Sequence, residues 1–340
     1  MAISTGTMPP DFRLPRTAEP PPQTQVPLAE LKEAAWYVPQ GWPDGWRAYH
    51  LALYVLRRFF GQEWVDSALK DTAGNVCGFL NPDAFDVASK DLAIHRHRVI
   101  DLAEDLFNLQ CIEGFCSPFD QLRTGSIEAA VAELEVASML KKLGVVFRFI
   151  SPLGKRGENY DLEITFPDGR VALADTKCKL EETPFGEATI SRTLSETTSQ
   201  FPPNKPSIVF LKVPQTWLSR EYGGAPIQEA LKKAAFRFLG ATTRVVSIKY
   251  FFRNLVFTSH GLVFPTYEYL EFANIKSPLA DAGSWKLFRP APEDVFDEIE
   301  AGRQTAGSQL GEWVFFGDVC DESDLNKLCP AVIVQSFMPE

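Results

Sequence analysis

The pattern of apolar residues changes its period along this 340-residue chain, and that change constrains the fold more than any other sequence feature. From residue 27 to 122, apolar side chains recur at steps of three and four residues, as in AYHLALYVLRRFF, which is the period of an α-helix. Beyond residue 144, short apolar runs such as VVFRFI and SIVFLKV alternate with helical segments, and such runs favour β-strands. The sequence therefore predicts an all-helical region followed by a region of strands and helices.

The second region predicts an ordered series of elements. A helix is expected over 125–144, because Ser126 can cap its N-terminus and Gly144 can end it. We then expect a strand, two strands joined by a turn, a helix, a strand, a helix and a strand, at 145–150, 159–179, 184–200, 207–213, 226–240 and 244–252. Helical connections between strands favour an α/β (α+β) fold, with a mixed sheet and helices packed on it.

Composition divides the chain into four parts. Residues 1–26 are rich in proline and poor in large apolar groups, so we expect them to be disordered. We expect a helical N-terminal domain at 27–122, a domain with the mixed sheet at 123–260, and an acidic C-terminal extension at 261–340. The extension holds 14 acidic and 5 basic residues, whereas residues 221–260 hold 2 acidic and 6 basic residues.

Charge and hydropathy argue against several classes of protein. The net charge of −10 is not that of a protein coated in basic residues for indiscriminate nucleic-acid binding. No apolar run approaches the ~20 residues of a membrane-spanning helix, and no basic-then-apolar leader opens the chain, so we expect no membrane association. The six cysteines are scattered through a long chain, which favours reduced thiols and a cytoplasmic location.

The segment NYDLEITFPDGRVALADTKCK, residues 159–179, predicts two strands around a tight turn at Pro167-Asp168-Gly169. If that turn has three residues, paired positions sum to 336 and Asp161 lies opposite Asp175. Side chains alternate between the two faces of a strand, so Lys177 shares a face with Asp175. Opposed like charges destabilise a sheet. The two carboxylates therefore indicate a divalent cation, which prefers oxygen ligands.

This order of elements, with an aspartate on the second strand and Asp-Thr-Lys on the third, resembles the PD-(D/E)XK nuclease superfamily. Asp161 corresponds to the first acidic position, although Tyr160 stands where the proline of the family name would be. Asp175 and Lys177 correspond to the second acidic residue and the lysine. The resemblance covers roughly residues 125–213, or reaches 252 at its widest. It implies a restriction-endonuclease-like αβββαβ core and metal-dependent hydrolysis of phosphodiester bonds in DNA or RNA.

The family often adds a glutamate from the first helix, about three turns before a glycine. Glu133 fits that spacing to Gly144 best, and Glu135 and Glu128 are alternatives. Glu133 shares its helix face with apolar residues and should point toward the sheet, where an ionised carboxylate needs a partner. The alternative for Glu133 is a carboxylate that reaches the surface.

The resemblance also implies roles for the residues of the site. Asp161, Asp175 and the backbone carbonyl of Thr176 would hold Mg²⁺ or Mn²⁺, and Glu133 would join them, for example where a second ion binds. Such an ion activates water and stabilises charge that develops on a phosphodiester. Lys177 would orient that water or stabilise the phosphorus centre with its positive charge.

A finer resemblance links the chain to an uncharacterised bacterial branch of the superfamily. The shared features are Lys177-Cys178-Lys179 after the third strand, the Gln200-Phe201-Pro202-Pro203 stretch, and Trp217 after the next strand. By this resemblance Gln200 is a candidate to support the site, and Glu135 is a second one.

Lys155, Arg156 and Lys179 are near enough in sequence to contact the phosphates that flank a cleaved bond, although each is equally an ordinary solvated charge. A second interpretation is a catalytically inactive nuclease-like domain that binds nucleic acid or protein, which the overall acidity and Tyr160 favour. A third is a scaffold whose protein partner binds the N-terminal helices or the acidic C-terminal region. Oligomeric state and biological pathway stay open.

Overall fold

The structure is a computed structural model of the chain. It describes residues 25–42, 44–69, 80, 90–151, 154–155, 157–180, 182–214, 217, 225–257, 263–280, 285, 287, 313–314, 316, 319 and 333–336. The segment 1–24 and most of the expected acidic extension lie outside these residues, so the predictions made for them are not examined by the structure.

Seven strands within the described residues form one mixed sheet, whose spatial order follows the sequence. They are β1 (Val146–Phe149), β2 (Leu162–Thr165), β3 (Val171–Cys178), β4 (Ser207–Lys212), β5 (Val245–Phe257), β6 (Val263–Ala273) and β7 (Ile333–Ser336). The pairs β1–β2, β2–β3 and β5–β6 are antiparallel, and β3–β4, β4–β5 and β6–β7 are parallel. The predicted mixed sheet is confirmed.

Eight α-helices and one short 3₁₀ helix accompany the sheet in the described part. They are α1 (Leu28–Trp36), α2 (Asp44–Phe60), α3 (Gln62–Leu69), α4 (Lys90–Leu109), α5 (Cys116–Thr124), α6 (Ile127–Lys142), α7 (Glu187–Thr197), the 3₁₀ helix η2 (Thr198–Gln200) and α8 (Ala225–Ala241). α7 connects β3 to β4 and α8 connects β4 to β5, as parallel strands require. Among these helices, none is both long and apolar enough to span a bilayer.

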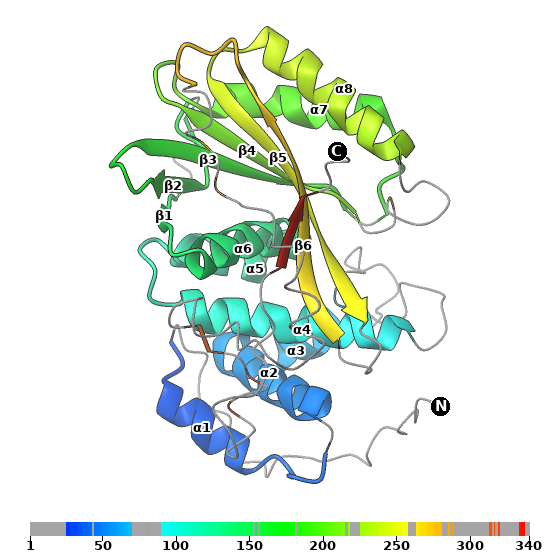
Figure 1. Ribbon diagram of the computed structural model, residues 1–340. Helices are drawn as coiled ribbons and strands as arrows, with labels where there is room; N and C mark the ends of the chain where they lie inside the picture. Colours follow the sequence, from blue (N-terminus) through cyan, green and yellow to red (C-terminus); the bar gives the residue numbers. More distant parts are fainter. Residues whose placement is uncertain are drawn as a thin grey trace.

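The sheet lies between two groups of helices. α7 and α8 cover one face, and α6 lies against the other face, with α4 and α2 beyond it (Figure 1). The two faces carry separate apolar clusters, one around α7 and α8 and a larger one that includes α6 and the N-terminal helices. α6 is therefore enclosed by the sheet and by the helical region.

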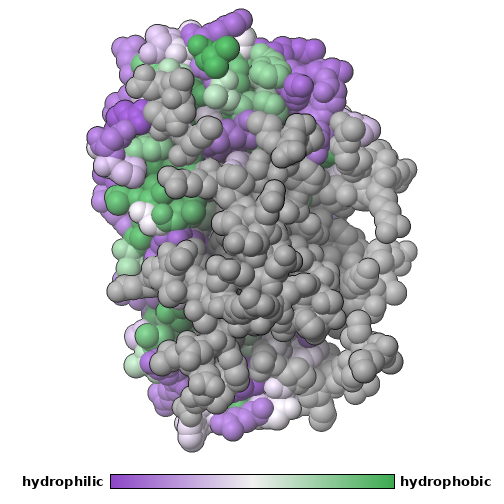
Figure 2. All heavy atoms as spheres, viewed as in Figure 1, coloured by the Kyte–Doolittle hydropathy of each residue, from purple (hydrophilic) through white to green (hydrophobic). Residues whose placement is uncertain are grey.

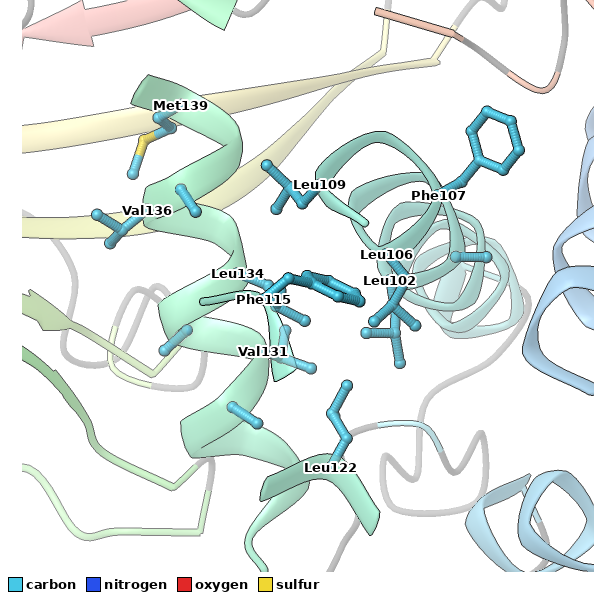
Figure 3. Packing of buried hydrophobic residues seen from close by; sticks show 14 of the residues in the cluster. Leu102, Leu106, Phe107, Leu109, Phe115, Leu122, Val131, Leu134, Val136 and Met139 are labelled. Atoms are coloured by element: carbon cyan, nitrogen blue, oxygen red, sulfur yellow. The ribbon is translucent and has the colours of Figure 1, made fainter. Parts of the chain in front are cut away.

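The side chains of α6 point to different sides of the helix, as its enclosed position requires. Val131 and Leu134 point toward Leu102 and Leu106 of α4, whereas Val136 lies on another side of the helix (Figure 3). Its ends follow the expected signals: Ser126 accepts a long hydrogen bond from the Ala129 amide at 3.5 Å, and Gly144 has φ +68°. The left-handed φ at this glycine ends the helix without steric strain.

The sheet continues across the domain boundary expected at residue 260, because β5 and β6 pair antiparallel on either side of it. The larger apolar cluster likewise includes side chains of the N-terminal helices and of the sheet. At the N-terminus, Val26 is only 1% exposed, and its backbone exchanges hydrogen bonds of 2.6 and 3.0 Å with the Gln110 side chain. The disorder expected for residues 1–26 therefore does not extend to Val26.

A short C-terminal segment docks on α4. Asn108 donates to the Val314 carbonyl at 2.9 Å and accepts from the Val314 amide at 2.7 Å. The Glu104 carboxyl accepts from the Phe316 amide at 2.8 Å. Phe316 is fully buried, and the Lys142 ammonium lies 4.3 Å from the centre of the Trp313 ring. Side chains of α4, more than 200 residues away in sequence, thus bind the backbone of Val314 and Phe316.

Glu104 makes the stability of the protein depend on pH. Burial, and next the charge of Asp101, raises the pKa of Glu104 to about 8, although the Phe316 amide and Lys142 act in the opposite direction. The folded state therefore holds this proton to a higher pH than the unfolded chain does. The stabilisation that protonated Glu104 gives to the folded state is complete below the ordinary carboxyl pKa. It is lost as the pH rises through about 8.

We expect the melting temperature to fall between about pH 5 and pH 8, and to fall less in Glu104→Gln, which keeps the oxygen that accepts from Phe316. One proton changes the free energy of unfolding by at most about 1.4 kcal/mol per pH unit. Melting curves over this range measure the difference between the two proteins. Asp120→Asn, at an exposed carboxyl of α5, is the control. Parallel profiles for wild type and Glu104→Gln would contradict the prediction.

Candidate functional site

The β2–β3 hairpin has the register expected from the sequence. Leu162 pairs with Ala174 and Thr165 with Val171, so each pair of positions sums to 336. The turn is closed at Gly169, which has φ +81°. Asp161 directly precedes β2, and its amide donates to the Ala174 carbonyl at 2.9 Å. This pairing brings Asp161 beside the end of β3.

Asp161, Asp175 and Lys177 form a connected group. The Asp161 Oδ2 atom accepts from the Thr176 amide at 2.6 Å. The Lys177 Nζ atom lies 3.1 Å from Oδ1 and 2.9 Å from Oδ2 of Asp175. Asp175 is fully buried, whereas the Lys177 side chain is 23% exposed. The lysine therefore lies between the buried carboxyl and solvent.

The carboxyl groups of the two aspartates act on each other's pKa. Burial, followed by the charge of Asp161, raises the pKa of Asp175 well above its ordinary value, and Lys177 only partly opposes this. Burial also raises the pKa of Asp161, against the charge of Lys177 and the bond from the Thr176 amide. Two neighbouring buried carboxyls resist ionising together. Ionisation of both carboxyls at once is therefore disfavoured in the folded protein.

Glu133 belongs to the same electrostatic group. It is 3% exposed, and burial followed by the charges of Asp161 and Asp175 raises its pKa well above the ordinary value, while Lys177 lowers it. Its Oε1 atom is buried and makes no hydrogen bond within the described residues. Among the three candidate glutamates of α6, the structure thus brings Glu133 to the two aspartates.

Glu135 lies elsewhere. Its carboxylate forms an ion pair of 2.6 Å with Lys212 at the end of β4, and both side chains are less than a tenth exposed. Glu128, the remaining alternative, is buried in the first turn of α6. The expected supporting role of Glu135 at the aspartates has no counterpart in these contacts, because its carboxylate is bound to Lys212 instead.

Gln200 and Asn159 meet next to the hairpin. Gln200 ends η2, and its backbone carbonyl accepts from the Asn159 amide at 3.2 Å. The side-chain oxygens of Gln200, Asn159 and Thr176 are buried without a hydrogen-bond partner in the described part of the chain. Asn159 was missed by the sequence reasoning, and its place two residues before Asp161 was the available signal.

The other predicted residues differ in their exposure and contacts. Lys155 is exposed and Lys179 is half-buried, and Arg156 lies outside the described residues. Cys178 is not disulfide-bonded, and it packs against the larger apolar cluster, as expected for a core thiol. Trp217 is 2% exposed, and its indole nitrogen donates to the Thr183 carbonyl at 2.6 Å, which makes it a packing residue.

The oxygen atoms of this group are ligands of the kind that a divalent cation binds, although the side chains do not converge on one point. Within the residues described, no three His, Cys, Asp or Glu side chains are gathered closely enough to hold an ion. The Asp175 carboxyl is instead paired with Lys177, and the Asp161 carboxyl accepts from the Thr176 amide. The unpartnered atoms of Glu133, Asn159, Thr176 and Gln200 are all oxygens, which are the ligands that Mg²⁺ prefers.

Three comparisons with known proteins complete this description. The chain matches no protein-family model, no curated protein and no solved structure.

Proposed function

We propose that the protein is a metal-dependent nuclease that hydrolyses phosphodiester bonds in DNA or RNA. The observation that supports the proposal best is a buried group of carboxyls next to Lys177, in which burial raises the pKa of Asp161, Asp175 and Glu133. Burying three carboxyls next to one lysine costs free energy, since one ion pair requires only one carboxylate. Arrangements that shift carboxyl pKa values in this way are concentrated at functional sites.

Each residue then has a role in phosphodiester hydrolysis. Asp161, Asp175 and the backbone carbonyl of Thr176 would hold Mg²⁺ or Mn²⁺, with Glu133 as a further ligand. The cation would supply positive charge that activates a water nucleophile and stabilises the charge developing on the phosphate. Lys177, whose ammonium lies at the solvent side of Asp175, would bind the phosphate and stabilise its negative charge.

The proposal includes a restriction-endonuclease-like core. The elements α6, β1, β2, β3, α7 and β4 follow one another in the αβββαβ order. Asp161 lies at the start of the second of these strands, and Asp175 and Lys177 lie near the end of the third. This agreement between element order and residue position supports the proposal.

The alternative is a nuclease-like domain that has kept the fold without catalysis. The specific observation in its favour is the ion pair between Lys177 and Asp175, which neutralises one buried carboxylate without a metal. Such a domain would bind nucleic acid or protein, and it would bind no divalent cation at these aspartates.

Titration calorimetry with Mg²⁺ and Mn²⁺, on wild type and on Asp175→Asn, tests the proposal together with a cleavage panel. The panel contains duplex DNA, single-stranded DNA and RNA, each with and without a chelator. We expect binding and chelator-sensitive cleavage in the wild type, and neither in the variant. Because burial raises the pKa of these carboxyls, cation binding should displace protons from them, seen as a buffer-dependent heat.

Two outcomes would contradict the nuclease proposal. Wild-type protein that binds no divalent cation would favour the inactive nuclease-like domain. Cleavage that continues unchanged with the chelator present would exclude a metal-dependent reaction.

A further inference from the structure

A second candidate binding site lies between α7 and α8, outside the group of carboxyls. A pocket of about 190 Å³ is partly open to solvent there. Its apolar part is formed by side chains of α8, namely Ala234, Phe238 and Ala241. Its polar part carries hydroxyl groups, those of Ser191, Ser195 and Thr198. Small side chains on both helices leave this space between them.

Ser191 gives the pocket an unused hydrogen-bonding group. Its Oγ atom is buried and makes no hydrogen bond with any described residue. The Ser195 hydroxyl donates to the Ser191 carbonyl at 2.8 Å, so it does not satisfy that atom. A hydroxyl can donate and accept, and a buried one without a partner lowers stability. A polar edge of a ligand in the pocket would supply the missing partner.

Arg237 adds a positive charge at the same pocket. Its guanidinium lies 3.0 Å from the Glu187 carboxylate, but the two side chains are 70% and 36% exposed. An ion pair this exposed is weak, so a phosphate can compete with Glu187 for the guanidinium. Lys232 and Lys233 are also exposed on α8, and the surface over α7 and α8, at the top of Figure 2, mixes hydrophilic and apolar residues.

The pocket lies close to the candidate site along the chain. Thr198, which lines the pocket, begins η2, and Gln200 ends it. A 3₁₀ helix rises about 2 Å per residue, so the backbones of Thr198 and Gln200 are roughly 4 Å apart along its axis. The Gln200 carbonyl accepts from Asn159, two residues before Asp161. η2 therefore links the pocket lining, through one backbone hydrogen bond, to the segment that leads into Asp161.

We propose that this pocket binds one nucleobase of a nucleic-acid strand and that Arg237 binds a phosphate adjacent to that base. The proposal rests on the nuclease function proposed above. The pocket is smaller than the roughly 300–1,000 Å³ of sites for drug-sized ligands, which suits a single flat ring. Its apolar wall would contact the face of the base, and its hydroxyls would bond the polar edge.

Fluorescence anisotropy of a labelled single-stranded oligonucleotide, measured with a chelator present, tests binding separately from cleavage. Ser195→Leu fills the pocket from an exposed position and should weaken binding about 10-fold. Arg237→Gln should weaken it about 5-fold. The control is Arg192→Gln, which removes the same charge from a side chain of α7 that is 84% exposed and outside the pocket lining. It should change binding less than about twofold.

The same oligonucleotide without bases separates the two contacts. On this abasic strand, Ser195→Leu should bind as the wild type does, whereas Arg237→Gln should still bind more weakly. Three results would overturn the proposal. The wild type and Ser195→Leu could bind the strand with bases equally well, or Arg192→Gln could weaken binding as much as Arg237→Gln does. The third result is that the wild type does not bind the oligonucleotide. Binding with this pattern but without metal-dependent cleavage would leave the pocket assigned and remove the nuclease function.

Discussion

Replacing Asp175 with asparagine should abolish metal-dependent cleavage and leave the melting temperature unchanged or higher. Asparagine keeps the shape of the side chain but removes the charged carboxyl that pairs with Lys177. The cation would then lose a charged ligand, and we expect the rate to fall by at least about 10²–10³-fold, as when one group that stabilises transition-state charge is removed. Stability should not fall, because a fully buried ionisable group is replaced by a neutral one.

Single-turnover cleavage and thermal unfolding of the same samples measure these two effects. Lys177→Ala should also lose cleavage but should retain metal binding, since the lysine is proposed to contact the phosphate and not the cation. Glu163→Gln is the matched control, because Glu163 belongs to the same hairpin and forms an ion pair of 3.0 Å with Arg148 instead. If cleavage survives in all three variants, Asp161→Asn, Asp175→Asn and Lys177→Ala, these residues do not form the active site.

The hairpin could be predicted because local chemistry determines it. The turn at Gly169 fixes the loop length, and strand alternation then fixes which side chains share a face. Asp161 and Asp175 are therefore brought together by signals within 20 residues of one another. Local signals of this kind also gave the order of helices and strands between α6 and β5.

The choice among the glutamates of α6 could not be predicted from the helical period. That period distinguishes a buried face from an exposed face, but Glu128, Glu133 and Glu135 are all buried, because the sheet and the N-terminal helices enclose α6. The partner of Glu135 is Lys212, on a strand far along the chain. Only tertiary packing reveals that Glu135 pairs with Lys212. It also reveals that Glu133, and not Glu135, interacts electrostatically with the aspartates.

The extent of the sheet was missed for a related reason. Charge composition separated residues 261–340 from the preceding domain, but the backbone of β6 pairs with β5 whatever the net charge of the segment. Strand pairing depends on backbone hydrogen bonds and on the alternation of side chains, and net charge reports neither.

The second large effect expected is on stability. Glu135→Ala should reduce the free energy of unfolding by about 3–5 kcal/mol, because it removes the carboxylate that pairs with the buried ammonium of Lys212. The double variant Glu135→Met with Lys212→Met should recover most of that loss, since apolar side chains of similar size can replace a buried ion pair. Urea unfolding of the wild type, Glu135→Met, Lys212→Met and the double variant measures the coupling. Losses in the single variants that simply add in the double variant would contradict it.

The same helix then separates a structural carboxylate from a functional one. Glu133→Gln should lose cleavage without losing stability, since the Oε1 atom of Glu133 has no hydrogen-bond partner among the described residues to forfeit. The double variant at Glu135 and Lys212 should keep cleavage once it is folded, because its ion pair does not involve the aspartates. If cleavage instead survives Glu133→Gln and disappears in the stable double variant, the third carboxylate of the site is Glu135. Glu133 and Glu135 flank Leu134 in the same helix. A difference between them would therefore come from the direction of each side chain and not from the place of α6 in the fold.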